Sequence, residues 1–172
     1  MPPARHTIVV QVFDEFKDSI ASGRVRTLAR RALSVALPGS TTNLSVVIAD
    51  DQAVRELNKR HRGLDETTDV LSFSFSHQGA YYGDGPAQSQ WNKDTAFVLP
   101  PGSSSGIGEI VISYPQMLRQ AKAHGKAPEE ELAFLLSHGV LHLLGHDHEE
   151  PRERAAMEAE QASLMERMLG KR

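Results

Sequence analysis

The segment SHGVLHLLGHDHEE, residues 137–150, holds four of the eight histidines in this 172-residue chain. His138 and His142 are four residues apart in an apolar stretch of helical character, so both side chains lie on one helix face, one turn apart. Gly145 allows the chain to leave that helix through a left-handed turn, which can return His148 to the same face. The segment therefore predicts a helix, a tight turn and three converging imidazoles.

Three histidines at this spacing predict a metal site. The chain has no cysteine, so a zinc ion would have only nitrogen and oxygen ligands. Three protein ligands leave a fourth position for water, as in catalytic zinc sites. The alternative is a closed structural site with His146 or Asp147 as the fourth ligand. A single histidine on an apolar helix would be an ordinary core or surface residue, but three in register with a glycine favour one bound zinc ion per chain.

The spacing H-x3-H-x2-G-x2-H resembles the zinc-binding frame of the metzincin peptidases, H-E-x-x-H-x-x-G-x-x-H. In metzincins the glutamate after the first histidine is the general base. Here Gly139 occupies that position. The sequence thus keeps the metal-binding frame but lacks the base of the peptidase reaction.

The composition is that of a soluble globular protein, with 40% hydrophobic and 24% charged residues. The length favours a single domain over residues 1–172. The N-terminus has no apolar run of signal-peptide type, and no apolar stretch is long enough to span a bilayer. These features predict a cytoplasmic protein without membrane contact. The net charge of -3 gives no overall attraction to nucleic acids, so such binding would need a local patch.

Hydrophobic periodicity and turn residues divide the chain into alternating elements. Strands are predicted at 6–12, 43–50, 68–75 and 108–113. Helices are predicted at 14–37, 50–63, 114–125, 128–145 and 150–169. Gly23 is a possible break in the first helix, Asp50 or Asp51 is the expected N-cap of the second, and Gly63 is its expected C-cap. Residues 77–105 predict a long loop, either a tolerated insertion or a functional segment.

Three segments together resemble the YbeY family, the bacterial endoribonucleases of rRNA maturation. The first is HGVLHLLGHDH, which is similar to the family's H-G-x-L-H-L-x-G-x-D-H. The second is LNKRHRGLDETTDVLSFSF (57–75), similar to L-N-x-x-x-R-x-x-D-x-x-T-D-V-L-S-F. The third is IGEIVIS (107–113), similar to L-G-D-I-x-I-S, and the three occur in family order. The chain departs from the pattern at Glu109, usually Asp, at Thr67, often Pro, and in its longer 77–105 loop.

The resemblance implies an α/β (α+β) fold, with a small mixed sheet of four strands, about five helices, and a metal site at a helix end and the following turn. It implies that His138, His142 and His148 hold a zinc ion and that Arg62 is the family's functional arginine, so that these four are the expected catalytic residues. The implied activity is a zinc-dependent endoribonuclease that cleaves single-stranded RNA in maturation of the 3′ end of 16S rRNA and in ribosome quality control. The expected partners are ribosomal RNA and the ribosome or its proteins, and not DNA.

The residues around Arg62 are compatible with phosphate binding. Residues 55–62 carry Arg55, Lys59, Arg60 and Arg62 against one glutamate, which makes a local positive patch. For Arg55, Lys59 and Arg60 the alternative is a solvated helix face without a role in binding. For the second basic stretch, at 24–31, a solvated face is the preferred interpretation. We expect Arg62→Ala to lose RNA cleavage while keeping its metal and melting temperature.

Two other functions compete with an endoribonuclease. One is a zinc peptidase, against which Gly139 argues. The other is a non-catalytic ribosome-assembly factor with a structural zinc. We interpret Gly139 as leaving space for a phosphodiester beside the metal. On this interpretation Gly139→Glu keeps the fold and the metal but loses RNA cleavage, and Gly139→Ala is milder.

Overall fold

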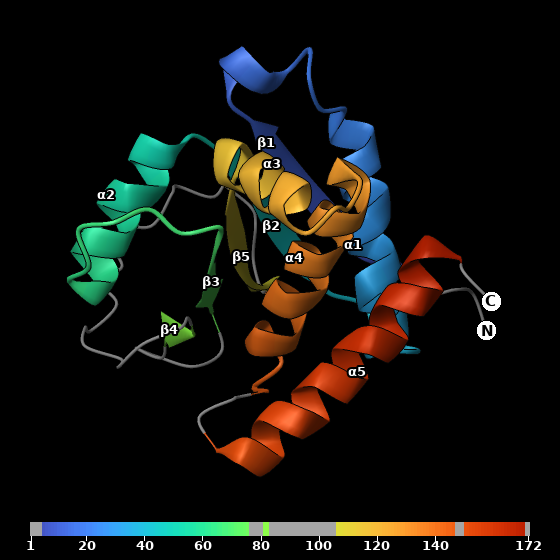
Figure 1. The fold of residues 1–172 in the computed structure, drawn as a ribbon. Helices are drawn as coiled ribbons and strands as arrows, with labels where there is room; N and C mark the ends of the chain where they lie inside the picture. The colour runs from blue at the N-terminus through green and yellow to red at the C-terminus, as the bar shows by residue number, and fades with distance from the viewer. Residues whose placement is uncertain (1–4, 76–80, 83–105, 147–149, 171–172) are drawn as a thin grey trace.

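Five strands form one mixed sheet, and helices cover both of its faces (Figure 1). The computed structural model describes residues 5–75, 81–82, 106–146 and 150–170. The strand order is β1-β2-β5-β3-β4, with bounds Thr7–Val12 for β1, Asn43–Ala49 for β2, Gly106–Ser113 for β5, Val70–Ser74 for β3 and Tyr81–Tyr82 for β4. Strands β1, β2 and β5 are parallel, whereas β3 runs antiparallel to β5 and β4 antiparallel to β3.

The helices confirm the predicted α/β class. Their bounds are Ser22–Ala36 for α1, Asp51–Arg62 for α2, Tyr114–Ala123 for α3, Pro128–Leu143 for α4 and Pro151–Leu169 for α5. The four predicted strands form the mixed sheet, and the two-residue β4 extends it from within the predicted 77–105 loop. The rest of that loop, apart from β4, lies outside the described residues.

The first predicted helix is shorter than its sequence pattern indicated. A single 3-10 turn, η1 (Asp14–Phe16), precedes α1, which begins at Ser22 and includes Gly23. The helix therefore starts before the predicted break. The reason is the apolar stripe, because the buried positions of α1 begin only at Val25. Without a continuous apolar face, the residues before Ser22 gain little from helical packing.

The two faces of the sheet bury separate apolar clusters, because successive strand residues point to opposite faces. The face toward α1, α4 and α5 carries the buried side chains Leu44, Val46, Ile48, Ile110 and Ile112. The face toward α2 carries Val47, Ala49, Leu71, Phe73 and Val111. In Figure 1, α2 stands on one side of the sheet, and α4 lies on the other with α5 outside it. Helices α2 and α4 thus lie on opposite sides of β5.

Helix ends follow the local signals. Asp50 is the N-cap of α2 and accepts a hydrogen bond from the Ala53 amide at 2.7 Å, and Gly63 ends α2 in the left-handed conformation. At the end of α4, Gly145 has φ of 91°, its amide donates to the His142 carbonyl, and the His146 amide donates to the Leu141 carbonyl. This pair of bonds is a Schellman turn. The predicted reversal after the second histidine is therefore present.

None of the described helices is long and apolar enough to cross a membrane.

Candidate active site

His138 and His142 meet near the C-terminal end of α4, as their spacing predicts. Their Nε2 atoms lie 2.9 Å apart, and their rings are nearly perpendicular, with centroids 4.4 Å apart. His142 is buried with 2% of its surface exposed, while His138 is only partly buried. His142 is therefore held in the protein interior, whereas part of His138 is accessible to solvent.

Neighbouring residues on α4 and α5 hold the helix that carries the pair. The Gln161 amide of α5 donates to the Phe134 carbonyl at 3.1 Å and to Ser137 Oγ at 3.3 Å. The Phe134 ring lies almost parallel to the His138 ring, 13° apart in plane and 6.3 Å between centroids. These contacts restrict the rotation of α4 and of the His138 ring, which is a requirement for a preorganised ligand.

The histidine pair fits a zinc ion. Two imidazole nitrogens bound to one tetrahedral zinc at about 2.0–2.1 Å lie roughly 3.3 Å from each other. The 2.9 Å Nε2–Nε2 distance is within a few tenths of an ångström of that value. The third predicted ligand, His148, lies outside the described residues, and among those described no three His, Asp or Glu side chains form a metal cluster. His146, the weaker candidate, is exposed.

Gly139 has a different role from the one its sequence position indicated. It is buried on α4, and a Cβ at this residue would lie 2.8 Å from Ile110 Cδ1 and 3.0 Å from Ile110 Cγ1. The missing side chain therefore makes room for β5, and the interpretation of an open space beside the metal is wrong. A side chain at this position would face the sheet, because residue 139 is rotated about 100° around the helix from His138.

Arg62 is the last residue of α2 and is buried, with 8% of its surface exposed. A solvated surface charge does not have this environment. The C-terminal end of a helix is favourable for a cation, because the carbonyl groups there carry partial negative charge. Helix α2 covers the face of the sheet opposite to α4, so Arg62 and the histidine pair come from two sides of the same sheet (Figure 1).

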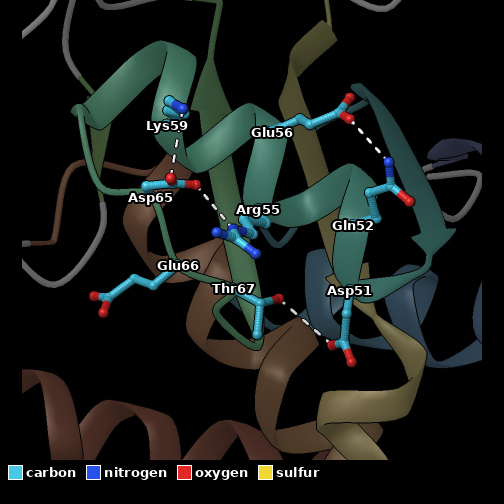
Figure 2. A pocket seen from close by; sticks show the side chains of 8 residues that line it. All are labelled: Asp51, Gln52, Arg55, Glu56, Lys59, Asp65, Glu66 and Thr67. Atoms are coloured by element: carbon cyan, nitrogen blue, oxygen red, sulfur yellow. Dashed lines mark hydrogen bonds and ion pairs between the residues drawn. The ribbon is translucent and has the colours of Figure 1, made fainter.

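Two other members of the predicted basic patch, Arg55 and Lys59, pair with an acid of the same protein. Figure 2 shows Arg55 and Lys59 both turned toward Asp65, with Arg55 Nε 2.8 Å and Lys59 Nζ 3.4 Å from its carboxylate. They line a cavity of about 800 Å³ that also contains Asp51, Glu56 and Glu66. Among the described residues of its lining, acidic side chains outnumber basic ones. These residues match the solvated-face alternative.

Thr67, one of the departures from the family pattern, lies at the same cavity. Its hydroxyl donates to Asp51 at 3.5 Å, and the Ser113 hydroxyl donates to the same carboxylate at 2.7 Å. Arg119 completes the cluster with a 2.9 Å ion pair to Asp51. The cluster connects the start of α2 to the end of β5 and the start of α3, so Asp51 has a structural role here.

The second basic stretch, at 24–31, also takes part in packing between helices. Arg24 pairs with Glu129 at the start of α4, and the Arg31 guanidinium donates to the Met168 carbonyl of α5 at 2.8 Å. These arginines join α1 to its neighbours. Both side chains are exposed, so the stretch lies on the surface as predicted, but these charges also contact neighbouring helices.

Glu109, a departure from the family pattern, is a buried acid. It lies on β5, opposite Ser45 of β2 and Phe73 of β3, with 5% of its surface exposed. The Ser45 hydroxyl donates to Glu109 Oε2 at 3.0 Å. Burial raises the pKa of Glu109 to about 7, although the Ser45 hydrogen bond acts in the opposite direction. The signal was a single charge within the otherwise uncharged strand GEIVIS.

His61 is a second polar residue on this side of the sheet. Its ring packs edge-on against Phe73, 5.2 Å between centroids, and burial, with a smaller effect of Arg60, lowers its pKa. Because Phe73 is paired with Glu109, both polar groups lie on the α2 face. The α2 face of the sheet, next to the helix that carries Arg62, thus contains the titratable side chains of Glu109 and His61. Their spacing in the sequence did not indicate that they lie on one face.

The carboxyl of Glu109 makes protein stability depend on pH. The unfolded chain releases this proton near the ordinary pKa of 4.5, whereas the folded protein retains it up to about 7. The stability contributed by the protonated carboxyl is therefore full below the unfolded pKa and is lost as pH rises through the folded pKa. The loss between these limits is about 3 kcal/mol.

The Glu109→Gln variant lacks this titrating carboxyl. We expect the free energy of unfolding of the parent, relative to that of the variant, to fall by about 3 kcal/mol between pH 4.5 and pH 8. Urea denaturation at both pH values measures this change. Ser45→Ala should have the opposite tendency and destabilise the protein more at pH 8, because the ionised carboxylate then loses its donor. A parent and a Glu109→Gln variant with parallel pH profiles would contradict the assignment.

Comparison with known proteins finds relatives over nearly the whole chain. The sequence model of the family Endoribonuclease YbeY matches residues 11–169. An Endoribonuclease YbeY of Dehalococcoides mccartyi is 37% identical over 158 residues, which cover 92% of this chain and 94% of that protein. An Endoribonuclease YbeY of Roseiflexus sp. is 33% identical and covers 99% of this chain and 97% of the relative.

The fold has a counterpart among solved structures. A solution structure of a Thermotoga maritima protein superimposes with a TM-score of 0.58 at 22% identity, covering 97% of this chain and 91% of that one. This likeness supports the fold alone. The family match and the sequence relatives carry the assignment further, because they extend over nearly the whole chain. The chain belongs to the YbeY endoribonuclease family.

Proposed function

We propose that this protein is a zinc-dependent endoribonuclease that cleaves single-stranded RNA in maturation of the 3′ end of 16S rRNA and in ribosome quality control. The single observation that carries the proposal is the convergence of His138 and His142, 2.9 Å apart at Nε2, within a chain that belongs to an endoribonuclease family. The expected partners are ribosomal RNA and ribosomal proteins, and the expected location is the cytoplasm.

His138, His142 and His148 would hold the zinc ion. Bound zinc supplies Lewis-acid chemistry for a phosphoryl oxygen and lowers the pKa of water. Phe134 and Gln161 fix the helix and ring orientation of the first ligand. These contacts hold the His138 side chain in place before the substrate binds, so less free energy is needed to reorganise the site during the reaction.

Arg62 would bind an oxygen of the RNA backbone. A guanidinium can form two parallel hydrogen bonds to a phosphate. Burial of the side chain in α2 limits its rotation, so the charge is held in one place. Single-stranded RNA is the expected substrate because its backbone can bend into a protein groove.

The proposal predicts about one zinc ion per chain and complete dependence of cleavage on it. Elemental analysis of protein purified without chelator measures the metal, and cleavage of a labelled single-stranded RNA before and after chelation measures the activity. Cleavage should fall at least about a hundredfold with chelator and return with added zinc. A protein that binds no metal, or that cleaves RNA equally well without it, would exclude the zinc mechanism.

His138→Ala separates a catalytic site from a structural one. The side chain is only partly buried, so its loss should shift the melting temperature little while lowering both zinc content and cleavage. His146→Ala is the matched control, since His146 is an exposed histidine just beyond the end of α4, and it should leave both unchanged. Unfolding of His138→Ala with loss of zinc would instead favour the assembly factor with a structural metal.

A further inference from the structure

A cavity of about 680 Å³ lies between α4 and α5 and includes His138 in its lining. It is separate from the acidic cavity beside α2, because none of the residues that line one cavity lines the other. Its volume lies in the range of about 300–1,000 Å³ that is typical of small-molecule sites. Since His138 is one of the proposed zinc ligands, a molecule in this cavity would lie directly beside the proposed cleavage site.

The floor of the cavity is apolar and includes the flat ring of Phe134. Met157 and Met165 of α5 and Phe134 of α4 line it. Phe134 is only partly buried and is nearly parallel to the His138 ring. Aromatic rings and methionine sulfur atoms pack well against planar, polarisable groups. A nucleobase is such a group, and proteins commonly bind unpaired bases by stacking on aromatic side chains.

The rim of the cavity carries two exposed cations. Arg154 of α5 and Lys126, which precedes α4, both line it, and Lys126 Nζ lies 5.2 Å from the centroid of the Phe134 ring. Among the described residues of the lining, Glu158 is the one acid, and basic side chains exceed acidic ones. Lys126 is exposed, and a lysine side chain has a flexible stem, so its ammonium can move from the ring toward an anion when another group covers the ring.

We propose that this cavity binds one nucleotide of single-stranded RNA next to the cleaved phosphodiester, with its base against Phe134 and its phosphates near Lys126 and Arg154. This inference rests on the proposed function. Complementarity of charge favours a polyanion over an apolar protein segment, because the apolar floor has cations on its edge. The flat ring beside the cations favours a nucleotide over an isolated phosphate.

Charge reversal at the rim tests the inference against matched surface controls. Lys126→Glu and Arg154→Glu should each weaken binding of a fluorescein-labelled, 2′-O-methyl single-stranded RNA about tenfold, and each should reduce the salt dependence of binding. The controls are Lys122→Glu and Arg152→Glu, two exposed residues outside the cavity lining with the same change of net charge. The controls should stay within about twofold of the parent in fluorescence anisotropy.

Photo-crosslinking tests the position of the base. An RNA that carries 5-iodouracil should crosslink to the peptide that contains Phe134, and Lys126→Glu should reduce this crosslink. If the parent cleaves RNA but the rim variants bind like their controls, or the crosslinks fall only elsewhere, the cavity assignment is wrong and the proposed function stands. If the parent neither binds nor cleaves RNA, both the cavity assignment and the proposed function are overturned.

Discussion

Gly139→Glu is expected to unfold the protein or to reduce its free energy of unfolding by at least about 4 kcal/mol. The Cβ of any other residue at this position would lie 2.8 Å from Ile110 Cδ1, and Ile110 is fully buried. The glutamate would also place a carboxylate between α4 and the sheet, where water cannot solvate it. Such a loss is a large part of the stability of a typical domain, about 5–15 kcal/mol.

Urea denaturation followed by circular dichroism measures this effect, and Gly23→Glu is the matched control. Gly23 is also helical, but it is exposed and a Cβ there would meet nothing within 4 Å. The control should be neutral or slightly stabilising, because glycine costs about 1 kcal/mol in a helix relative to alanine. A Gly139→Glu protein as stable as the parent would show that residue 139 does not face β5.

Gly139→Ala should show the same clash at lower cost. Alanine improves the helix by about 1 kcal/mol, but overpacking against Ile110 costs about 1–3 kcal/mol, so a small net loss is expected. Ile110→Val removes Cδ1, the atom nearest to the new methyl group. Combining the two substitutions should therefore cost less than the sum of the single changes, and a strictly additive result would contradict the contact.

Arg62→Ala is expected to lower RNA cleavage at least about a hundredfold, because a charge-assisted contact to phosphate would be lost. The sequence alone led us to expect no change in stability. Since Arg62 is 8% exposed, we now expect the variant also to lose about 2 kcal/mol, through lost packing of the long side chain. Arg62→Met retains much of that packing without the charge, so it should recover stability but not cleavage.

Arg60→Ala is the matched control, since Arg60 is exposed on the same turn of α2. It should keep both stability and cleavage within about twofold of the parent. Zinc content, melting temperature and cleavage rate of the four proteins distinguish the two roles of Arg62. Cleavage by Arg62→Met at the parental rate would show that Arg62 serves only packing.

The sequence by itself determined the features that depend on near neighbours along the chain. Asp50, Gly63 and Gly145 end or begin helices through hydrogen bonds to residues within five positions, so their effect can be read from local spacing. The contact of His138 with His142 is also local, because four residues make one helical turn. Hydrophobic patterns were sufficient for the positions of four strands, and the resemblance of three motifs was sufficient for the mixed sheet and for the family.

Only the tertiary structure decided the environment of each side chain. Gly139 meets Ile110, 29 positions away, and Glu109 meets Ser45, 64 positions away, so no local pattern reveals the tight helix–sheet contact or the raised pKa. Arg62 has the same charge as Arg55, but one is buried at a helix end and the other is exposed and pairs with Asp65. Charge and spacing are properties of the chain, whereas burial and pairing arise when distant segments pack together, and these decide whether a group is free to act on a substrate.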